Sequence, residues 1–169
     1  MEKKQMADKK MQLLLNIAKV VMLVLILVFV VSIYNSVDRD YDALVPDVAA
    51  AVFGEEAPAG SQTGTDLEFR DVYGLDTDQY EGMVYYRPVS NMDVTEIVIA
   101  KSSSDEALNS LVAAAEERVA DQKSVFEGYA PEQYGILQEA IISKKGNYVF
   151  FVVSADADGF YDAMLKAVE

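Results

Sequence analysis

The chain has 169 residues, of which 51% are hydrophobic, and this allows one packed domain beside a membrane segment. Its formal net charge of −14 repels phosphate backbones, so we expect no nucleic-acid partner. The absence of Cys and His excludes disulfides, thiolate nucleophiles, Cys/His zinc sites and Ser-His-Asp triads, and we expect no cofactor and no metal.

A basic tail precedes a long apolar stretch. We expect residues 1–12 to be a cytoplasmic tail and residues 13–34 a transmembrane anchor, with Val20, Leu25 and Val31 in its apolar centre. The stretch approaches the roughly 20 residues that span a bilayer, and the lysines before it favour a cytoplasmic N-terminus. A cleaved signal peptide is the alternative. In either case the C-terminal domain is expected outside the cytoplasm, and the anchored form would be a single-pass protein of the cell membrane in contact with its lipid.

Residues 35–65 are predicted to be an acidic juxtamembrane segment and linker, with the folded domain at residues 66–169. Pro46 and Gly54 mark the start and end of one short helix in this segment. The residues that follow Gly54 are rich in Gly, Ser, Thr and Ala, a composition typical of a flexible linker.

Within residues 66–169 the pattern predicts, in order, a helix, two strands, two helices, two strands and a helix. Thr65 stands three residues before Glu68, the spacing of a capping box. The short turns inside each strand pair imply antiparallel hairpins. We therefore predict an α+β fold, a small antiparallel sheet built from two β-hairpins with helices packed on one face, preceded by one transmembrane helix. The predicted strands are residues 82–89, 95–101, 140–144 and 148–154.

Two acidic runs imitate parts of a calcium-binding loop. Residues 38–42 alternate Asp with other residues, but Ala43 and Ala49 stand where such a loop needs Gly and Glu. Asp156 and Asp158 follow the apolar run 148–154, but too few ligands accompany them. We interpret the first run as a solvated collar and Asp156 as the N-cap of the last helix.

Three segments, YGLDTDQYEGMVYYRPVSNMDVTEIVIAK, ERVADQKSVFEGYAPEQY and KGNYVFFVVSADAD, follow one another within residues 66–158. In this order they resemble the domain of unknown function 4358 family of bacterial membrane-anchored or lipid-anchored proteins. The resemblance implies a shared fold and supplies no activity, cofactor or catalytic residue. It also implies an association with membrane-bound O-acyltransferases and surface-polysaccharide machinery.

Loop residues supply the candidate interaction surface. Asn91, Met92, Tyr129 and Tyr134 are the candidates, since binding residues are common in loops and exposed tyrosines stack on sugar rings. The polar face of the long helix, which carries Arg118, is interpreted as solvated.

We predict no catalytic residue and expect an accessory or binding module that is not an enzyme. It would serve cell-envelope machinery, with a membrane protein or an envelope glycan as its partner. The alternative is a small envelope hydrolase that uses carboxylates, with Glu127, Glu132 and Glu139 as the candidate group. A third hypothesis is a sensor module that transmits a signal through its membrane helix to a partner protein.

Overall fold

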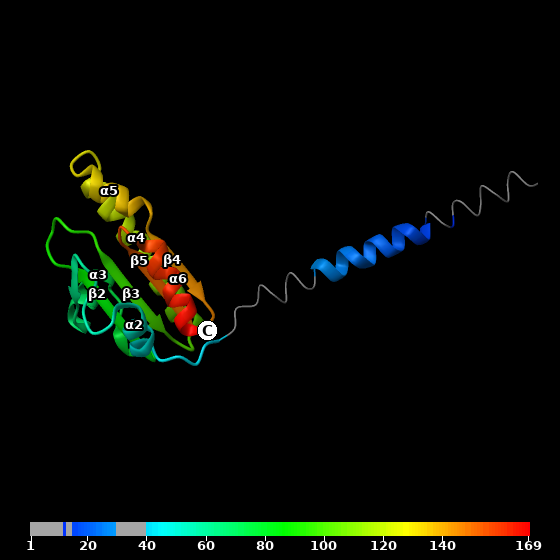
Figure 1. The fold of residues 1–169 in the computed structure, drawn as a ribbon, viewed down its shortest axis with the longest axis horizontal. Helices are drawn as coiled ribbons and strands as arrows, with labels where there is room; N and C mark the ends of the chain where they lie inside the picture. Colours follow the sequence, from blue (N-terminus) through cyan, green and yellow to red (C-terminus); the bar gives the residue numbers. More distant parts are fainter. Residues whose placement is uncertain (1–11, 13–14, 30–39) are drawn as a thin grey trace, which may run out of the picture. The chain divides into compact units, whose positions relative to one another are not determined.

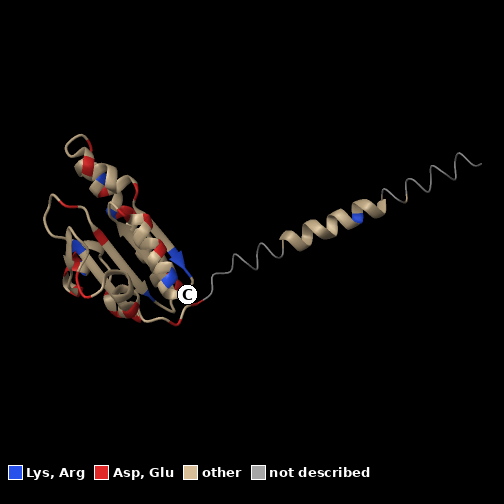
Figure 2. Cartoon of the chain, in the orientation of Figure 1, with Lys and Arg blue, Asp and Glu red and all other residues tan. Residues whose placement is uncertain are grey.

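The computed structural model describes residue 12, residues 15–29 and residues 40–169. The chain divides into two units, Met1–Asp38 and Arg39–Glu169. In the first unit a helix covers residues 15–29 with exposed side chains. Lys19 is the only charged residue of this stretch, and in Figure 2 the helix is tan apart from one blue stretch. No helix of the described residues is long and apolar enough to cross a membrane. The predicted anchor contains Val20 and Leu25 of this helix, whereas Val31 lies outside the described residues.

The second unit is built on a five-stranded antiparallel sheet with the order β1-β2-β3-β5-β4 (Figure 1). Both predicted hairpins are confirmed, as the pairs β2–β3 and β4–β5. In the central ladder, Val98 of β3 lies opposite Phe151 of β5. The strands are β1 (Ser61–Thr63), β2 (Gly82–Pro88), β3 (Glu96–Lys101), β4 (Ile141–Lys145) and β5 (Tyr148–Val153).

Helix ends follow local side-chain chemistry. Thr65 and Glu68 form the predicted capping box at the start of α3, and Ser104 accepts a hydrogen bond from the backbone of Ala107 at the start of α4. Asp156 is the N-cap residue of α6 as predicted, but its side chain makes no cap hydrogen bond. The helices are α2 (Val45–Phe53), α3 (Asp66–Tyr73), α4 (Asp105–Phe126), α5 (Pro131–Gln138) and α6 (Ala157–Val168), with a 3-10 turn η1 at Thr77–Gln79.

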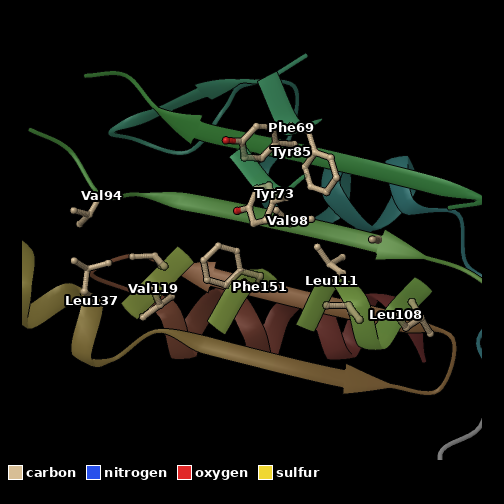
Figure 3. Packing of buried hydrophobic residues seen from close by; sticks show 14 of the residues in the cluster. Phe69, Tyr73, Tyr85, Val94, Val98, Leu108, Leu111, Val119, Leu137 and Phe151 are labelled. Carbon is tan, nitrogen blue, oxygen red and sulfur yellow. The ribbon is translucent and has the colours of Figure 1, made fainter. Parts of the chain in front are cut away.

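The helices cover both faces of the sheet, so the prediction of helices on one face is wrong. Val98 and Phe151 belong to a core shared with α3, α4 and α5, part of which Figure 3 shows. Their neighbours Ile97 and Phe150 point the other way, into a core shared with α2 and α6. Successive side chains of a strand point to opposite faces, so a strand buried on both faces carries an unbroken apolar run. Residues 148–153 are such a run, and all six are buried.

The compact unit begins before residue 66, where the sequence places the start of the domain. Val45 and Val48 of α2 are each 1% exposed and pack against the face of the sheet that carries Ile97 and Phe150. β1 pairs with β2, with Gln62 opposite Arg87, although its composition is that of a linker. A three-residue strand of Ser, Gln and Thr carries no hydrophobic alternation, and this is why the sequence does not reveal it.

Candidate functional site

A fully buried glutamate lies at the first position of β3. Glu96 has an exposed fraction of 0% and points to the same face as Val98 and Ala100, two and four residues along the strand. A buried carboxylate needs several hydrogen-bond donors, because removal of its charge from water is costly. The surroundings of Glu96 therefore define a polar cluster within an apolar layer.

Four side chains donate to this carboxylate. The hydroxyls of Tyr73 and Tyr85 donate to Oε1 of Glu96 at 2.8 and 3.1 Å. On the other oxygen, Nε of Arg118 donates to Oε2 at 3.0 Å and Nε2 of Gln122 at 3.4 Å. Figure 3 shows the two tyrosine rings with their hydroxyl oxygens on the same side. We call Glu96 and these four residues the Glu96 cluster. It joins α3, β2, β3 and α4.

Both tyrosines of the cluster remain hydrogen-bond donors over a wide pH range. Burial raises the pKa of Tyr73 well above its ordinary value, and the negative charge of Glu96 raises this pKa further. Burial and the same carboxylate also raise the pKa of Tyr85. The two hydroxyls therefore stay protonated in the folded protein at any neutral or mildly alkaline pH.

The rings of the cluster are held by close packing. Phe69 stacks on Tyr73 with ring centroids 4.7 Å apart and meets the ring of Tyr85 edge-on at 5.6 Å. Gly64 also lies against the ring of Tyr85, where an added Cβ would come within 2.4 Å of the ring. The backbone N–H of Gly64 also donates to the carbonyl of Tyr85 at 2.8 Å. Only glycine allows this approach, so Gly64 helps to fix the ring that reaches Glu96.

A pocket of about 390 Å³ lies beside the cluster, a volume typical of ligand sites. Its lining comes from α3, from the end of β2, from the β2–β3 loop and from α4. Arg118, Gln122 and Tyr85 belong both to the lining and to the Glu96 cluster, so the buried carboxylate holds one wall of the pocket in place. The remaining lining residues are Val72, Arg87, Pro88, Val89, Ser90, Asn91, Asp93, Asp121, Val125 and Phe126.

The guanidinium groups of the two arginines in the pocket differ in how many of their nitrogens contact other side chains. Nε of Arg87 lies 2.8 Å from a carboxylate oxygen of Glu68. With its amide oxygen turned toward Arg87, Gln62 accepts from Nη1 and Nη2 at 2.8 and 3.0 Å. Arg118, in contrast, binds Glu96 through Nε, and its Nη atoms bond to none of the described residues. Oε1 of Gln122 is buried and likewise has no described partner. Nε of Arg87 is buried too, and although it lies close to Glu68 it makes no hydrogen bond. Polar atoms without hydrogen-bond partners therefore occur at all three residues of this wall, Arg87, Arg118 and Gln122.

Of the four predicted surface residues, only Asn91 lines this pocket. Met92 lies in the same loop and is 50% exposed, and Tyr129 is 69% exposed beyond the end of α4. Tyr134 is partly buried and packs against the core. The solvated interpretation of Arg118 is wrong, because its side chain is 29% exposed and paired with a buried carboxylate.

Sequence reasoning missed Glu96 as a site residue, although one signal was present. Glu96 begins a strand in which every residue but the last is buried, and it alternates in phase with Val98 and Ala100. A charged residue in phase with the core face of a buried strand must find partners inside the protein. The partners themselves come from distant helices, and a single sequence does not show which ones.

Two of the glutamates proposed for hydrolysis line a second, shallow pocket of about 360 Å³. Glu132 and Glu139 lie there with Ile136 and Ser154, whereas Glu127 is not part of the lining. Glu132 is in the first turn of α5 and Glu139 is its C-cap, so their backbones are about 10 Å apart along the helix axis. Inverting glycosidases hold their two carboxyl groups about 6.5–9.5 Å apart. Across the part of the chain that the structure describes, no group of three or more acids is placed to hold a metal ion.

Comparison with known proteins gives one match. A family described as a domain of unknown function (DUF4358) matches residues 57–154. The match begins before β1 and ends just after β5, so it contains all five strands and the whole Glu96 cluster. No curated protein and no solved structure matches the chain. The matched segment is more than half of the chain, and the protein therefore belongs to the DUF4358 family.

Proposed function

We propose that the unit Arg39–Glu169 is a binding module that works as an accessory of cell-envelope machinery and is not an enzyme. In this proposal residues 13–34 tether it to the cell membrane, with the module outside the cytoplasm. The observation that carries the binding role is the pocket beside the Glu96 cluster, where aliphatic side chains and polar atoms without partners converge.

Exposed aliphatic side chains surround this pocket. Val72, Val89 and Val125 are 38%, 49% and 69% exposed, and all three contribute to the lining. Single exposed apolar residues are common, but a group around one concavity is typical of an interaction site. A partner seated on the pocket would remove this apolar surface from water.

The Glu96 cluster supports binding rather than acid–base chemistry. The carboxylate of Glu96 does not line the pocket, and both of its oxygens already accept hydrogen bonds. A general base must reach the proton that it removes, and Glu96 lies behind Arg118 and Tyr85. Its role in the proposal is to orient the side chain of Arg118.

The tether and the envelope role rest on sequence features. Five lysines and two acids occur in residues 1–19, whereas the rest of the chain is strongly acidic, a distribution that favours a cytoplasmic N-terminus. The resemblance of the sequence to membrane-anchored or lipid-anchored bacterial proteins agrees with this proposal. The partner in this proposal is a membrane protein or an envelope glycan.

The test is photo-crosslinking in intact bacterial cells with the full-length chain. A photoreactive residue replaces Val125 in one variant and Leu67 in the control. Leu67 is a comparably exposed apolar residue, at 63%, outside the pocket lining. We expect a discrete crosslinked species from position 125 only. Equal or absent crosslinking from the two positions would overturn the binding role of this pocket.

The alternative is a carboxylate-dependent envelope hydrolase at the second pocket, favoured by the joint presence there of Glu132 and Glu139. In that case the purified full-length protein releases soluble fragments from cell-wall glycan, and replacement of both residues by Gln abolishes the release. Unchanged release by the double variant would exclude these two glutamates as its source.

A further inference from the structure

We propose that the pocket beside the Glu96 cluster binds an extended peptide segment of a partner protein, with apolar side chains and a basic residue. This inference rests on the binding role proposed above and adds the chemical class of the ligand. Three features of the pocket carry it: a donor and an acceptor without partners, an aliphatic wall and an excess of negative charge.

The donor and the acceptor stand one helical turn apart on α4. The Nη atoms of Arg118 are donors without a partner among the described residues. Oε1 of Gln122 is an acceptor that also has no partner there. Residues at positions i and i+4 are neighbours on one face of a helix. A peptide backbone offers the complement, since its C=O accepts from Arg118 while an N–H donates to Gln122. Gln122 is 7% exposed, and a buried amide oxygen without a partner is costly, so such a bond would be favourable.

The wall beside this pair is aliphatic. Val125 follows on the same helix, and Pro88 with Val89 lines the side formed by the end of β2 and its loop. Aliphatic side chains fit the side chains of an extended peptide, whereas sugar rings prefer the flat face of an aromatic residue. Phe126 and Tyr85, the aromatic residues of the lining, are only 5% exposed each and offer no such face.

Charge selects a basic rather than an acidic segment. Arg87 pairs with Glu68 and Arg118 with Glu96, so each arginine charge in the pocket has a carboxylate beside it. Asp93 and Asp121 then remain in the lining without a cationic partner among the described residues. Their field attracts Lys or Arg and repels acidic ligands, including phosphate groups.

The experiment is selection of linear peptides from a display library on the full-length protein in lipid nanodiscs. One selected peptide is then synthesised with capped ends, and its affinity is measured by fluorescence anisotropy. The variants are Val125→Lys, which adds charge to the aliphatic wall, and Arg118→Lys, which can keep an ion pair with Glu96 but lacks the Nη donors. Leu67→Lys is the matched surface control, and thermal melting verifies that each variant is folded.

We expect selected sequences that combine aliphatic residues with Lys or Arg. Affinity should fall roughly tenfold in Val125→Lys and in Arg118→Lys and stay unchanged in Leu67→Lys. Replacement of the basic residue of the peptide by Glu should weaken binding to a similar degree.

Three results would overturn the inference: no selected peptide, acidic selected peptides, or affinity that Val125→Lys leaves unchanged. If the crosslinked species at position 125 in cells is a polysaccharide, the peptide inference fails while the binding role stands. If position 125 yields no specific crosslink and no peptide is selected, both proposals fail.

Discussion

Glu96 and Arg118 form an ion pair in which water reaches only one partner. The side chain of Glu96 is 0% exposed, whereas that of Arg118 is 29% exposed. Loss of the arginine would strand a charge that solvent cannot reach, but loss of the carboxylate charge leaves a guanidinium that can still be hydrated. The two halves of the pair should therefore differ in what their removal costs.

We expect Arg118→Met to lower the free energy of unfolding by about 3–5 kcal/mol and Glu96→Gln to lower it by about 1–2 kcal/mol. The double variant should lose less free energy of unfolding than the sum of the two single losses. Without the Glu96 charge, removal of the arginine no longer leaves a buried charge unpaired. Urea denaturation of the four proteins gives the coupling energy. Glu116→Gln, at an exposed position of the same helix, should change stability by less than about 0.5 kcal/mol. Equal costs for the two single variants would contradict this account.

Tyr148 provides a pH-dependent part of the stability. Its hydroxyl donates to the carbonyl oxygen of Ala43, and burial, with smaller effects of Asp47 and Glu81, raises its pKa from 10.0 to about 12. Above pH 10 the unfolded chain ionises this phenol while the folded chain keeps it protonated. The unfolded state then binds fewer protons, so stability falls as the pH rises toward about 12.

In Tyr148→Phe this contribution is absent. We expect the variant to lose stability with rising pH less steeply than the parent between pH 10 and about 12, by up to about 1.4 kcal/mol per pH unit. Urea midpoints measured at several pH values in that window give both slopes. Parallel curves for the two proteins would show that Tyr148 does not titrate differently on folding.

At the scale of elements, the long amphipathic helix, both hairpins and the capping box could be predicted, because each has a local signal. The Leu and Ala spacing of α4 and the turn at Gly146 need no distant information. Strand β1 and the partners of Glu96 could not be predicted, because they depend on contacts between segments far apart in the chain. The second layer of helices had a signal, since an unbroken run such as 148–153 is typical of a strand covered on both sides.

Helix α2 lies before residue 66, where the sequence places the start of the domain, yet it packs against the sheet. Val45 lies against Gly82 of β2, where a Cβ added to the glycine would be 3.3 Å from the valine side chain. Val48 belongs to the same core as Phe150 and Met164. The helix therefore closes one face of the sheet and is part of the fold.

We expect a chain that begins at residue 66 to be poorly folded, and Val48→Ala in the full chain to cost about 1.5–3 kcal/mol. Leu44→Ala is the control, since the side chain of Leu44 is 62% exposed. This change should lower the free energy of unfolding by less than about 0.5 kcal/mol. Circular dichroism and urea denaturation measure both effects. A cooperative unfolding transition of normal stability in the shortened chain would contradict a structural role for α2.

At the scale of the whole molecule, the acidic body and the basic N-terminal tail carry the proposed topology. In Figure 2 acidic residues occur on each of the helices that cover the sheet, while the sheet itself is mostly uncharged. The chain has no Cys, so one introduced cysteine provides a unique label.

We expect Tyr129→Cys, at a position that is 69% exposed, to react in intact cells with a maleimide that does not cross membranes. Lys4→Cys should react only after permeabilisation, because the lysine-rich tail is proposed to be cytoplasmic. Mass-shift gels report both reactions. Labelling of Lys4→Cys but not Tyr129→Cys in intact cells would reverse the topology.

The strand order also has a kinetic consequence. β3 and β5 are neighbours in the sheet, yet the whole of α4, α5 and β4 separates them in the chain. Each hairpin can form early from nearby residues, but the ladder between the hairpins must wait for a large loop to close. Until it closes, one edge of the most apolar strand in the sheet is open to other chains. Refolding yield should therefore fall with protein concentration, with β5 as the strand through which chains associate.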